Sequence, residues 1–255
     1  MLLTVLGCSG SFPGPSEPAS GYLLDVNGAR FAIDLGNGTL AALQAYADPF
    51  SLDALLLSHL HPDHCADFSA LTVLRRYHPN PPLDPREARL PVYGPSEAPS
   101  RLAAAYAPDA AELADTDLSD VYSFHQWASK ADIAGVTVRT ARVAHPCEAY
   151  GLRVEHEGRT FVYTGDSGAC AALTELATGA DVLLSEASWT HAEDRPVGLH
   201  LSGREAGELA EAAGVGKLIV THVPPWADTE AILAEARTAF PGEVVLAEQG
   251  ADYQI

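Results

Sequence analysis

Residues 59–64 read His59-Leu60-His61-Pro62-Asp63-His64 and place three imidazole rings and one carboxylate within six positions. They follow the apolar run Ala54–Leu57, which is typical of a buried β-strand. Neutral imidazole and carboxylate groups are ligands of zinc and related divalent metals, and few other purposes need so many of them together. Histidines that cluster by chance rarely follow a buried strand so directly. The stretch therefore predicts a metal-binding loop at the end of a strand.

Alternate positions of an extended segment point the same way, so we expect His59 and His61 to reach one ion and Asp63 and His64 a second. More donors come after strand-like runs later in the chain: His145 after Val136–Val143, Asp166 after Phe161–Thr164, and His222 after Lys217–Thr221. Taken singly, each of these is better explained as a strand-end histidine or a turn aspartate without a metal. Together with the first cluster they predict one site with two metal ions, whose ligands come from the ends of several strands.

These residues, in this order and spacing, resemble the metallo-β-lactamase superfamily over most of the chain. The resemblance implies an α/β fold, a four-layer αββα sandwich of two mixed β-sheets, in one hydrolase domain spanning residues 1–255. It implies two divalent metal ions, with zinc expected first and manganese second. It also implies seven ligands: His59, His61 and His145 at one ion, Asp63, His64 and His222 at the other, and Asp166 bridging both.

The last third of the chain resembles the ribonuclease Z branch of phosphodiesterases. Residues 185–188 (Ser-Glu-Ala-Ser) are similar to the HEAT segment of that branch, and residues 200–202 (His-Leu-Ser) to its HST loop, with Ser185 and Leu201 departing from the pattern. Two further stretches, Leu6–Ser11 and Arg89–Pro95, are similar to the opening glycine loop and to a middle strand and turn of the same branch.

Three residues are expected to act in catalysis. An alkoxide is a poor leaving group unless it is protonated, so we expect His200 to be the general acid, with Glu186 accepting its other ring N–H. The alternative for His200 is a surface histidine beside a helix. Asp63 is expected to position the attacking water as well as to bind metal. Ser202 and Glu205 form a candidate capping box that would start a helix just after His200.

The charge of the chain bears on the substrate. With 15 Lys and Arg against 34 Asp and Glu, the net charge is −19, and an acidic surface repels long nucleic acids. The resemblance implies that processing of transfer RNA uses a long basic arm, usually between the motif histidine and the bridging aspartate, whereas residues 146–165 leave room only for a short hairpin. We therefore expect a small-molecule phosphodiester, a 3′,5′-cyclic nucleotide first. The alternatives are a ribonuclease Z-like RNA 3′-end endonuclease, a lactonase or other ester hydrolase on the same scaffold, and a metal-binding protein without activity.

Other features concern location and organisation. The apolar start Met1–Leu6 is too short for a signal peptide, no run has membrane-spanning length, and the four cysteines lack CxxC spacing, so we expect a cytoplasmic protein without membrane contact. The sequence is also compatible with a homodimer. Within residues 78–91, the proline-rich stretch His78–Pro85 is either a lid over the site or a surface connection. Expected elements include strands at 23–26 and 30–33, a helix at 67–77, and a hairpin of 150–155 and 160–163.

Overall fold

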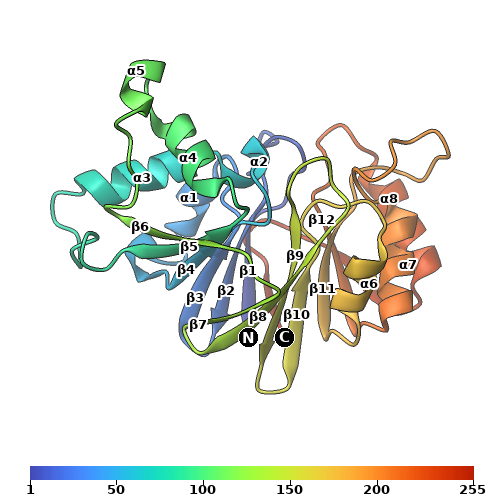
Figure 1. The fold of residues 1–255 in the computed structure, drawn as a ribbon. Helices are drawn as coiled ribbons and strands as arrows, with labels where there is room; N and C mark the ends of the chain where they lie inside the picture. Colours follow the sequence, from blue (N-terminus) through green and yellow to red (C-terminus); the bar gives the residue numbers. More distant parts are fainter.

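The computed structural model describes all residues from 1 to 255, and two seven-stranded β-sheets face each other at its centre (Figure 1). Across the first sheet the order is β14 (Asp252–Gln254), β1 (Leu2–Gly7), β2 (Gly21–Val26), β3 (Ala29–Ile33), β4 (Ala54–Leu56), β5 (Leu90–Gly94) and β6 (Tyr122–Gln126). Across the second it is β13 (Glu243–Leu246), β12 (Lys217–Thr221), β11 (Val182–Glu186), β10 (Arg159–Tyr163), β9 (Tyr150–His156), β8 (Val136–Arg142) and β7 (Lys130–Ile133).

Helices cover the outer face of each sheet (Figure 1). On the first sheet these are α1 (Thr39–Leu43), α2 (Pro62–Cys65), α3 (Phe68–Tyr77) and α4 (Ala98–Tyr106), with a short 3₁₀ turn at Pro49–Ser51. The short helix α5 (Ala110–Leu113) has no buried residue and projects beyond α4, away from the sheet (Figure 1). On the second they are α6 (Ala171–Ala177), α7 (Gly203–Ala213) and α8 (Thr229–Ala239). Each sheet contains parallel and antiparallel pairs, so the predicted αββα sandwich of two mixed sheets is confirmed. None of the helices combines the length and the apolar character that crossing a membrane requires.

The apolar runs explain these layers, because strands buried on both faces need apolar residues at every position. In β4, Ala54 and Leu56 pack into the core between the sheets, whereas Leu55 packs beneath the helices of the first sheet. In β10, Phe161 and Val162 divide in the same way between the central core and the core under α6 to α8. Because successive side chains along a strand point to opposite faces of the sheet, the strands contribute residues to three separate apolar clusters.

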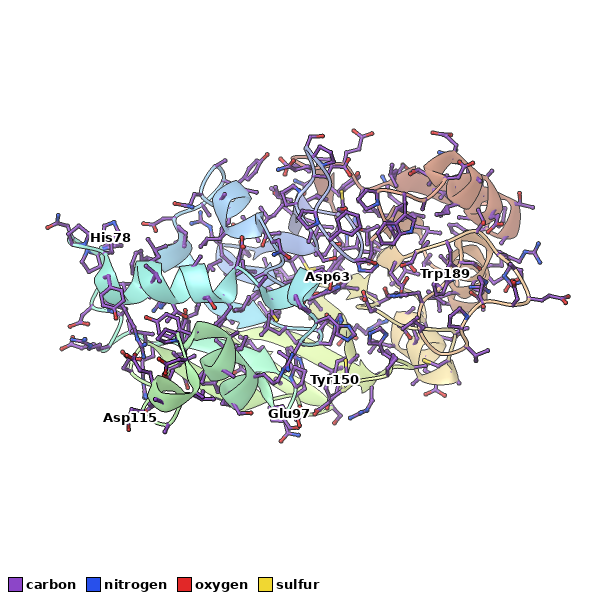
Figure 2. All side chains as sticks on the ribbon, turned by 90° about the horizontal axis from the view of Figure 1, so that it is seen from above. Asp63, His78, Glu97, Asp115, Tyr150 and Trp189 are labelled. Carbon is purple, nitrogen blue, oxygen red and sulfur yellow. The ribbon has the colours of Figure 1, made fainter.

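Two local expectations are refined. The predicted metal-binding stretch is not entirely loop, because α2 begins at Pro62, and a proline is well tolerated at the first position of a helix. The stretch His78–Pro85 follows the far end of α3, a ten-residue helix that is about 15 Å long. Figure 2 shows His78 at one end of the molecule and Asp63 near its middle. Of the two alternatives, the stretch is therefore a surface connection and not a lid.

Candidate metal centre

The predicted donors lie at one edge of the paired sheets because of strand direction. Strands β10, β11 and β12 are mutually parallel, and β8 runs the same way because β9 pairs antiparallel with both β8 and β10. Their carboxyl ends therefore meet at one edge, where residues at the end of these strands or shortly after them come together: His145, Asp166, Glu186 and His222. In the first sheet, β3 and β4 are parallel and deliver Asp34 and His59 to the same edge.

The first group of donors consists of three imidazoles and one carboxylate. The ligand atoms of His59, His61, His145 and Asp166 all lie within 4.8 Å of one another. Nδ1 of His61 is 3.1 Å from Nε2 of His59 and 3.2 Å from Nε2 of His145. Burial lowers the pKa of His59 well below its ordinary value, and it also lowers the pKa values of His61 and His145. The three rings are therefore neutral near pH 7 and keep a lone pair for a metal ion.

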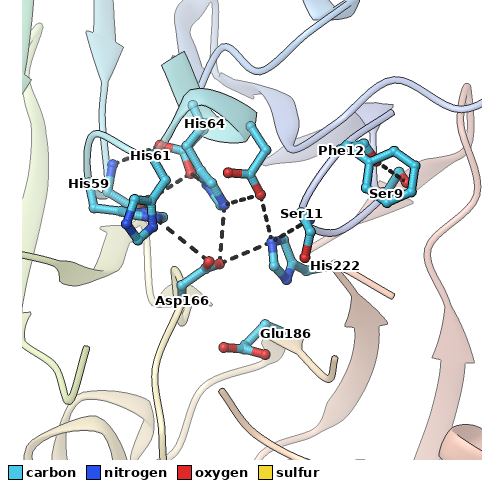
Figure 3. Close-up of polar contacts among 12 residues, drawn as sticks. Ser9, Ser11, Phe12, His59, His61, His64, Asp166, Glu186 and His222 are labelled. Carbon is cyan, nitrogen blue, oxygen red and sulfur yellow. Dashed lines mark hydrogen bonds and ion pairs between the residues drawn. The ribbon is translucent and has the colours of Figure 1, made fainter. Parts of the chain in front are cut away.

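The second group shares Asp166 with the first. The ligand atoms of Asp63, His64, Asp166 and His222 also lie within 4.8 Å of one another. Nε2 of His222 is 3.2 Å from Oδ2 of Asp63 and 3.4 Å from Oδ1 of Asp166 (Figure 3). Burial would lower the pKa of His64, but Asp166 and Asp34 raise it well above its ordinary value. The two carboxylates next to the buried His64 ring therefore stabilise its positively charged form.

Two buried polar atoms without hydrogen-bond partners show that these residues fit a metal ion. Nε2 of His64 and Oδ1 of Asp166 are buried and 3.2 Å apart, yet neither makes a hydrogen bond. Buried polar atoms without a partner are costly and rare. A divalent cation bound between these atoms would satisfy both, and the set of imidazole and carboxylate donors suits zinc. The residues therefore fit the divalent metals that the sequence predicts.

Asp34 supports this centre and is missing from the sequence prediction. Its carboxylate is fully buried, and Oδ2 lies 2.7 Å from Nδ1 of His64. It also accepts hydrogen bonds from Ser58 N (2.7 Å), from Ser58 Oγ (2.7 Å) and from the Tyr163 hydroxyl (3.0 Å). A carboxylate on one ring nitrogen fixes the orientation of the imidazole and directs the other nitrogen toward the metal. The signal in the sequence was a lone aspartate directly after the apolar run Phe31–Ile33.

The other imidazoles are held in the same way. Nδ1 of His59 lies 3.1 Å from Ser58 Oγ, and Nδ1 of His145 lies 2.9 Å from the carbonyl oxygen of Leu199. Nδ1 of His222 lies 3.1 Å from Oγ of Ser188, the last residue of the HEAT-like segment. His59, His64, His145 and His222 thus each have Nδ1 held by a neighbouring group, which directs Nε2 toward the centre, whereas His61 turns its Nδ1 toward Nε2 of His59 and of His145. The sequence prediction did not assign this orienting role to Ser58 or Ser188.

The structure brings His200 and Glu186 together beside the donors. Nδ1 of His200 is 2.8 Å from Oε1 of Glu186 and 3.8 Å from Oδ2 of Asp166. Burial alone would lower the pKa of His200, but the Glu186 carboxylate raises it to about 9. Glu186 is itself fully buried and accepts hydrogen bonds from Ser167 N and Ser188 Oγ. The pair is therefore fixed in place, with the other ring nitrogen of His200 free to meet a substrate.

The helix that follows His200 begins as expected. Ser202 accepts from the backbone N–H of Glu205, and the Glu205 side chain accepts from Ser202 N, which makes a complete capping box at the start of α7. Arg195 also contacts Glu205 at 3.0 Å and so ties the preceding loop to the helix. This network holds the backbone at His200 in a defined position.

A cavity of about 260 Å³ opens on the His61 side of the centre. Its lining is mostly polar: Leu60, His61, Pro95, Glu97, Arg101, Cys147 and Glu148. Figure 2 shows Glu97 and Tyr150 on this side of Asp63 and Trp189 on the opposite half of the molecule. Cys147, two residues after the donor His145, is part of this lining. The cavity offers space for a small organic group next to the donors.

Comparison with known proteins agrees with this geometry. A family model described as a β-lactamase superfamily domain matches residues 29–223. The chain belongs to the metallo-β-lactamase superfamily.

Three members of the superfamily illustrate the relationship. The Mycobacterium tuberculosis protein Rv1339, described as uncharacterized, is 48% identical over 95% of this chain and 88% of its own. A ribonuclease Z from Mycobacterium sp. strain KMS is 32% identical, covering 96% and 93%. The metallo-β-lactamase-fold protein YhfI of Bacillus subtilis is 30% identical, covering 98% of both chains. The YhfI crystal structure aligns with a TM-score of 0.84 over 99% of both chains at 28% identity. The protein is thus a metallo-hydrolase of the β-lactamase fold with relatives in the ribonuclease Z group.

Proposed function

We propose that this protein is a phosphodiesterase that depends on two divalent metal ions and hydrolyses a small phosphodiester such as a 3′,5′-cyclic nucleotide. The observation that carries the proposal is the 2.8 Å contact between His200 and Glu186 at the border of the donor cluster. A phosphodiester with an alkoxide leaving group needs a proton donor of this kind, whereas a lactam or a thioester needs one less.

The donors would hold two ions, zinc in the first instance and manganese in the second. His59, His61 and His145 would bind one ion, Asp63, His64 and His222 the other, and Asp166 both. Bound divalent cations supply Lewis-acid activation of water and charge stabilisation of the phosphoryl oxygens.

The protein's own groups have distinct roles in this proposal. Glu186 occupies Nδ1 of His200, which leaves Nε2 to donate a proton to the departing ribose oxygen. Asp63 is only partly engaged, through His222 at 3.2 Å, and would orient the attacking water. Ser167 N and Ser188 Oγ hold the Glu186 carboxylate and so keep the proton donor aligned during turnover.

Three observations support a small substrate. The net charge of −19 opposes the binding of long nucleic acid, whose affinity for proteins comes chiefly from phosphate contacts with Lys and Arg. Residues 146–165 form the short hairpin of β9 and β10 and carry no long arm. The cavity of about 260 Å³ beside His61 has room for a small molecule and not for a folded RNA, and Arg101 in its lining would attract one phosphate.

The relationship to ribonuclease Z gives the second candidate, an RNA 3′-end endonuclease, which is favoured by 32% identity over nearly the whole chain. A lactonase or another ester hydrolase on the same scaffold is a third. A parallel assay separates them: metal-loaded protein is tested on 3′,5′-cyclic AMP, bis-nitrophenyl phosphate, a lactone and a precursor transfer RNA. We expect hydrolysis of the cyclic nucleotide with little cleavage of transfer RNA. Efficient RNA cleavage with no turnover of cyclic nucleotides would refute the proposal in favour of the endonuclease.

A further inference from the structure

Two large aromatic side chains are exposed next to the centre. Phe12, in the loop after β1, is 41% exposed, and Trp226, in the loop after β12, is 68% exposed. Their rings are stacked, with centroids 4.8 Å apart and an angle of 28° between the planes. Aromatic rings of this size normally contribute to cores or interfaces, so a stacked pair left in contact with solvent indicates a binding surface.

The pair is joined to the metal centre through His222. The backbone N–H of Ser11, next to Phe12, lies 3.4 Å from Nε2 of His222. The backbone N–H of His222 donates to Cys8 O, and Gly10 N donates to Val223 O. Figure 3 shows Ser11 and Phe12 on the His222 side of the cluster, opposite His59 and His61. The exposed aromatic surface therefore borders the centre on the side away from the His61 cavity.

The loop that carries Phe12 is fixed before any ligand binds. Oγ of Ser9 donates to Phe12 O at 2.7 Å, and Phe12 N donates to Gly10 O at 2.8 Å. A Cβ at Gly10 would lie 2.2 Å from the carbonyl oxygen of His222, so only glycine permits this close approach. A preorganised ring surface loses little entropy when a flat ligand stacks on it.

From these observations we propose that Phe12 and Trp226 form a stacking platform for the base of a nucleotide bound at the centre, an inference that rests on the proposed function. Every nucleobase has a π-face that stacks on aromatic rings, and stacking needs no cation on the protein. That suits a chain with a net charge of −19, on which affinity from Lys and Arg is scarce. The phosphodiester would then lie over the donors and the base over the exposed face of Trp226.

The test compares two substrates, 3′,5′-cyclic AMP and the analogue in which hydrogen replaces the base, on four proteins: the unaltered protein, Trp226→Ala, Phe12→Ala and Tyr77→Ala. Tyr77 is the matched control, because it is similarly exposed (67%) but lies at the far end of α3. We expect the ratio of kcat/KM for cyclic AMP to that for the analogue to fall roughly 5- to 150-fold in Trp226→Ala, the range that loss of base stacking gives. The fall should come mainly from KM for cyclic AMP. Tyr77→Ala should leave the ratio unchanged.

A second measurement needs no turnover. Trp127 is buried and Trp189 partly buried, so stacking of 5′-AMP on the platform should quench the fluorescence of Trp226. We expect quenching by 5′-AMP and none by ribose 5-phosphate, and we expect the quenching to disappear in Trp226→Phe while Tyr77→Ala retains it. Trp226→Phe keeps an aromatic ring for stacking and should preserve most of the ratio of kcat/KM between the two substrates. The variant therefore separates loss of the fluorescence signal from loss of nucleotide binding.

The outcomes distinguish the two proposals. If the unaltered protein hydrolyses neither substrate, the proposed function fails, and the titration with 5′-AMP still decides on the platform. Hydrolysis of both substrates with equal losses in Trp226→Ala would reduce Trp226 to a support for the His222 loop and overturn the inference. So would a change of the substrate ratio in Arg101→Ala but not in Trp226→Ala, since the base would then lie in the His61 cavity. Self-association that is abolished by Trp226→Ala, with nucleotide binding intact, would assign the platform to a second copy of the chain.

Discussion

Replacing Asp34 by asparagine tests whether a residue that binds no metal sets the affinity of the centre. Oδ1 of Asp34 accepts from Ser58 N at 2.7 Å. Oδ2 accepts from Ser58 Oγ and the Tyr163 hydroxyl, and it lies 2.7 Å from Nδ1 of His64. An asparagine has only one oxygen, so its NH₂ group must face a donor whichever way the amide is oriented.

The structure gives the size of the effect. With the NH₂ group at the Oδ1 position, one buried N–H loses its acceptor, which costs about 1–3 kcal/mol of the free energy of unfolding. With the NH₂ group at the Oδ2 position, Nδ1 of His64 has to accept, and its proton moves to Nε2, the atom 3.2 Å from Asp166. A protonated Nε2 is no longer a metal ligand, so we expect affinity for one of the two ions to fall about 10- to 100-fold.

The assay is metal analysis after equilibration with a chelator of known affinity, together with chemical unfolding of the metal-loaded protein. Tyr163→Phe is the matched control, because it removes a single donor to Asp34 and keeps the carboxylate. It should cost about 1 kcal/mol of stability, with metal affinity close to that of the unaltered protein. If Asp34→Asn binds two ions as tightly as Tyr163→Phe does, Asp34 does not orient His64 and the reasoning is wrong.

Three further expectations can be checked directly. Asp166→Ala should lose bound metal and activity together, because Asp166 belongs to both donor groups; elemental analysis that finds both ions retained would rule out its bridging role. His200→Ala should keep its metal but lower turnover of an alkyl phosphodiester by about 10²- to 10⁴-fold, with a smaller loss on a nitrophenyl ester; equal losses on both esters in steady-state assays would argue against proton donation. Burial raises the pKa of Cys8 to about 12, so at pH 8 its thiolate fraction is roughly 10³-fold below that of a thiol with the ordinary value. Mass spectrometry after iodoacetamide treatment should find Cys8 unmodified in the folded protein and alkylated in urea, and rapid alkylation of folded protein would contradict this.

Much of the architecture was predictable because its signals are local. A mostly apolar run followed by a candidate metal ligand is visible within ten positions, as at Ala54–His59 or Lys217–His222, and both runs form strands, β4 and β12. The expected helix at 67–77 is α3, and the expected hairpin is β9 and β10. The carboxyl ends of parallel strands lie at the same edge of a sheet. The candidate ligands that follow these strands are therefore expected to lie close together once the strands are identified.

The remaining features depend on contacts between distant segments. Asp34 reaches His64 only because β3 and β4 are parallel neighbours, and its φ of 55° belongs to a bend that no propensity predicts. Phe12 and Trp226 meet because Ser9 and Val223 form a bridge between loops from opposite ends of the chain. The turn of helix at Pro62 is four residues long, which is too short for a helical period to show in the sequence.

The buried carboxylates at this edge differ in how completely the protein satisfies their oxygen atoms. Asp34, Asp166 and Glu186 are each at most 2% exposed, and an ionised carboxylate is stable at such burial only if it is paired or hydrogen-bonded. Asp34 faces donors from Ser58, Tyr163 and His64, and Glu186 faces donors from Ser167, Ser188 and His200, so both are satisfied by the protein. Asp166 differs, because its Oδ1 has no hydrogen bond although three histidines surround it. The protein thus supplies hydrogen-bond donors to Asp34 and Glu186 but leaves Oδ1 of Asp166, the carboxylate common to both donor groups, without one. A cation between the two donor groups would give Oδ1 of Asp166 the partner that the protein does not supply.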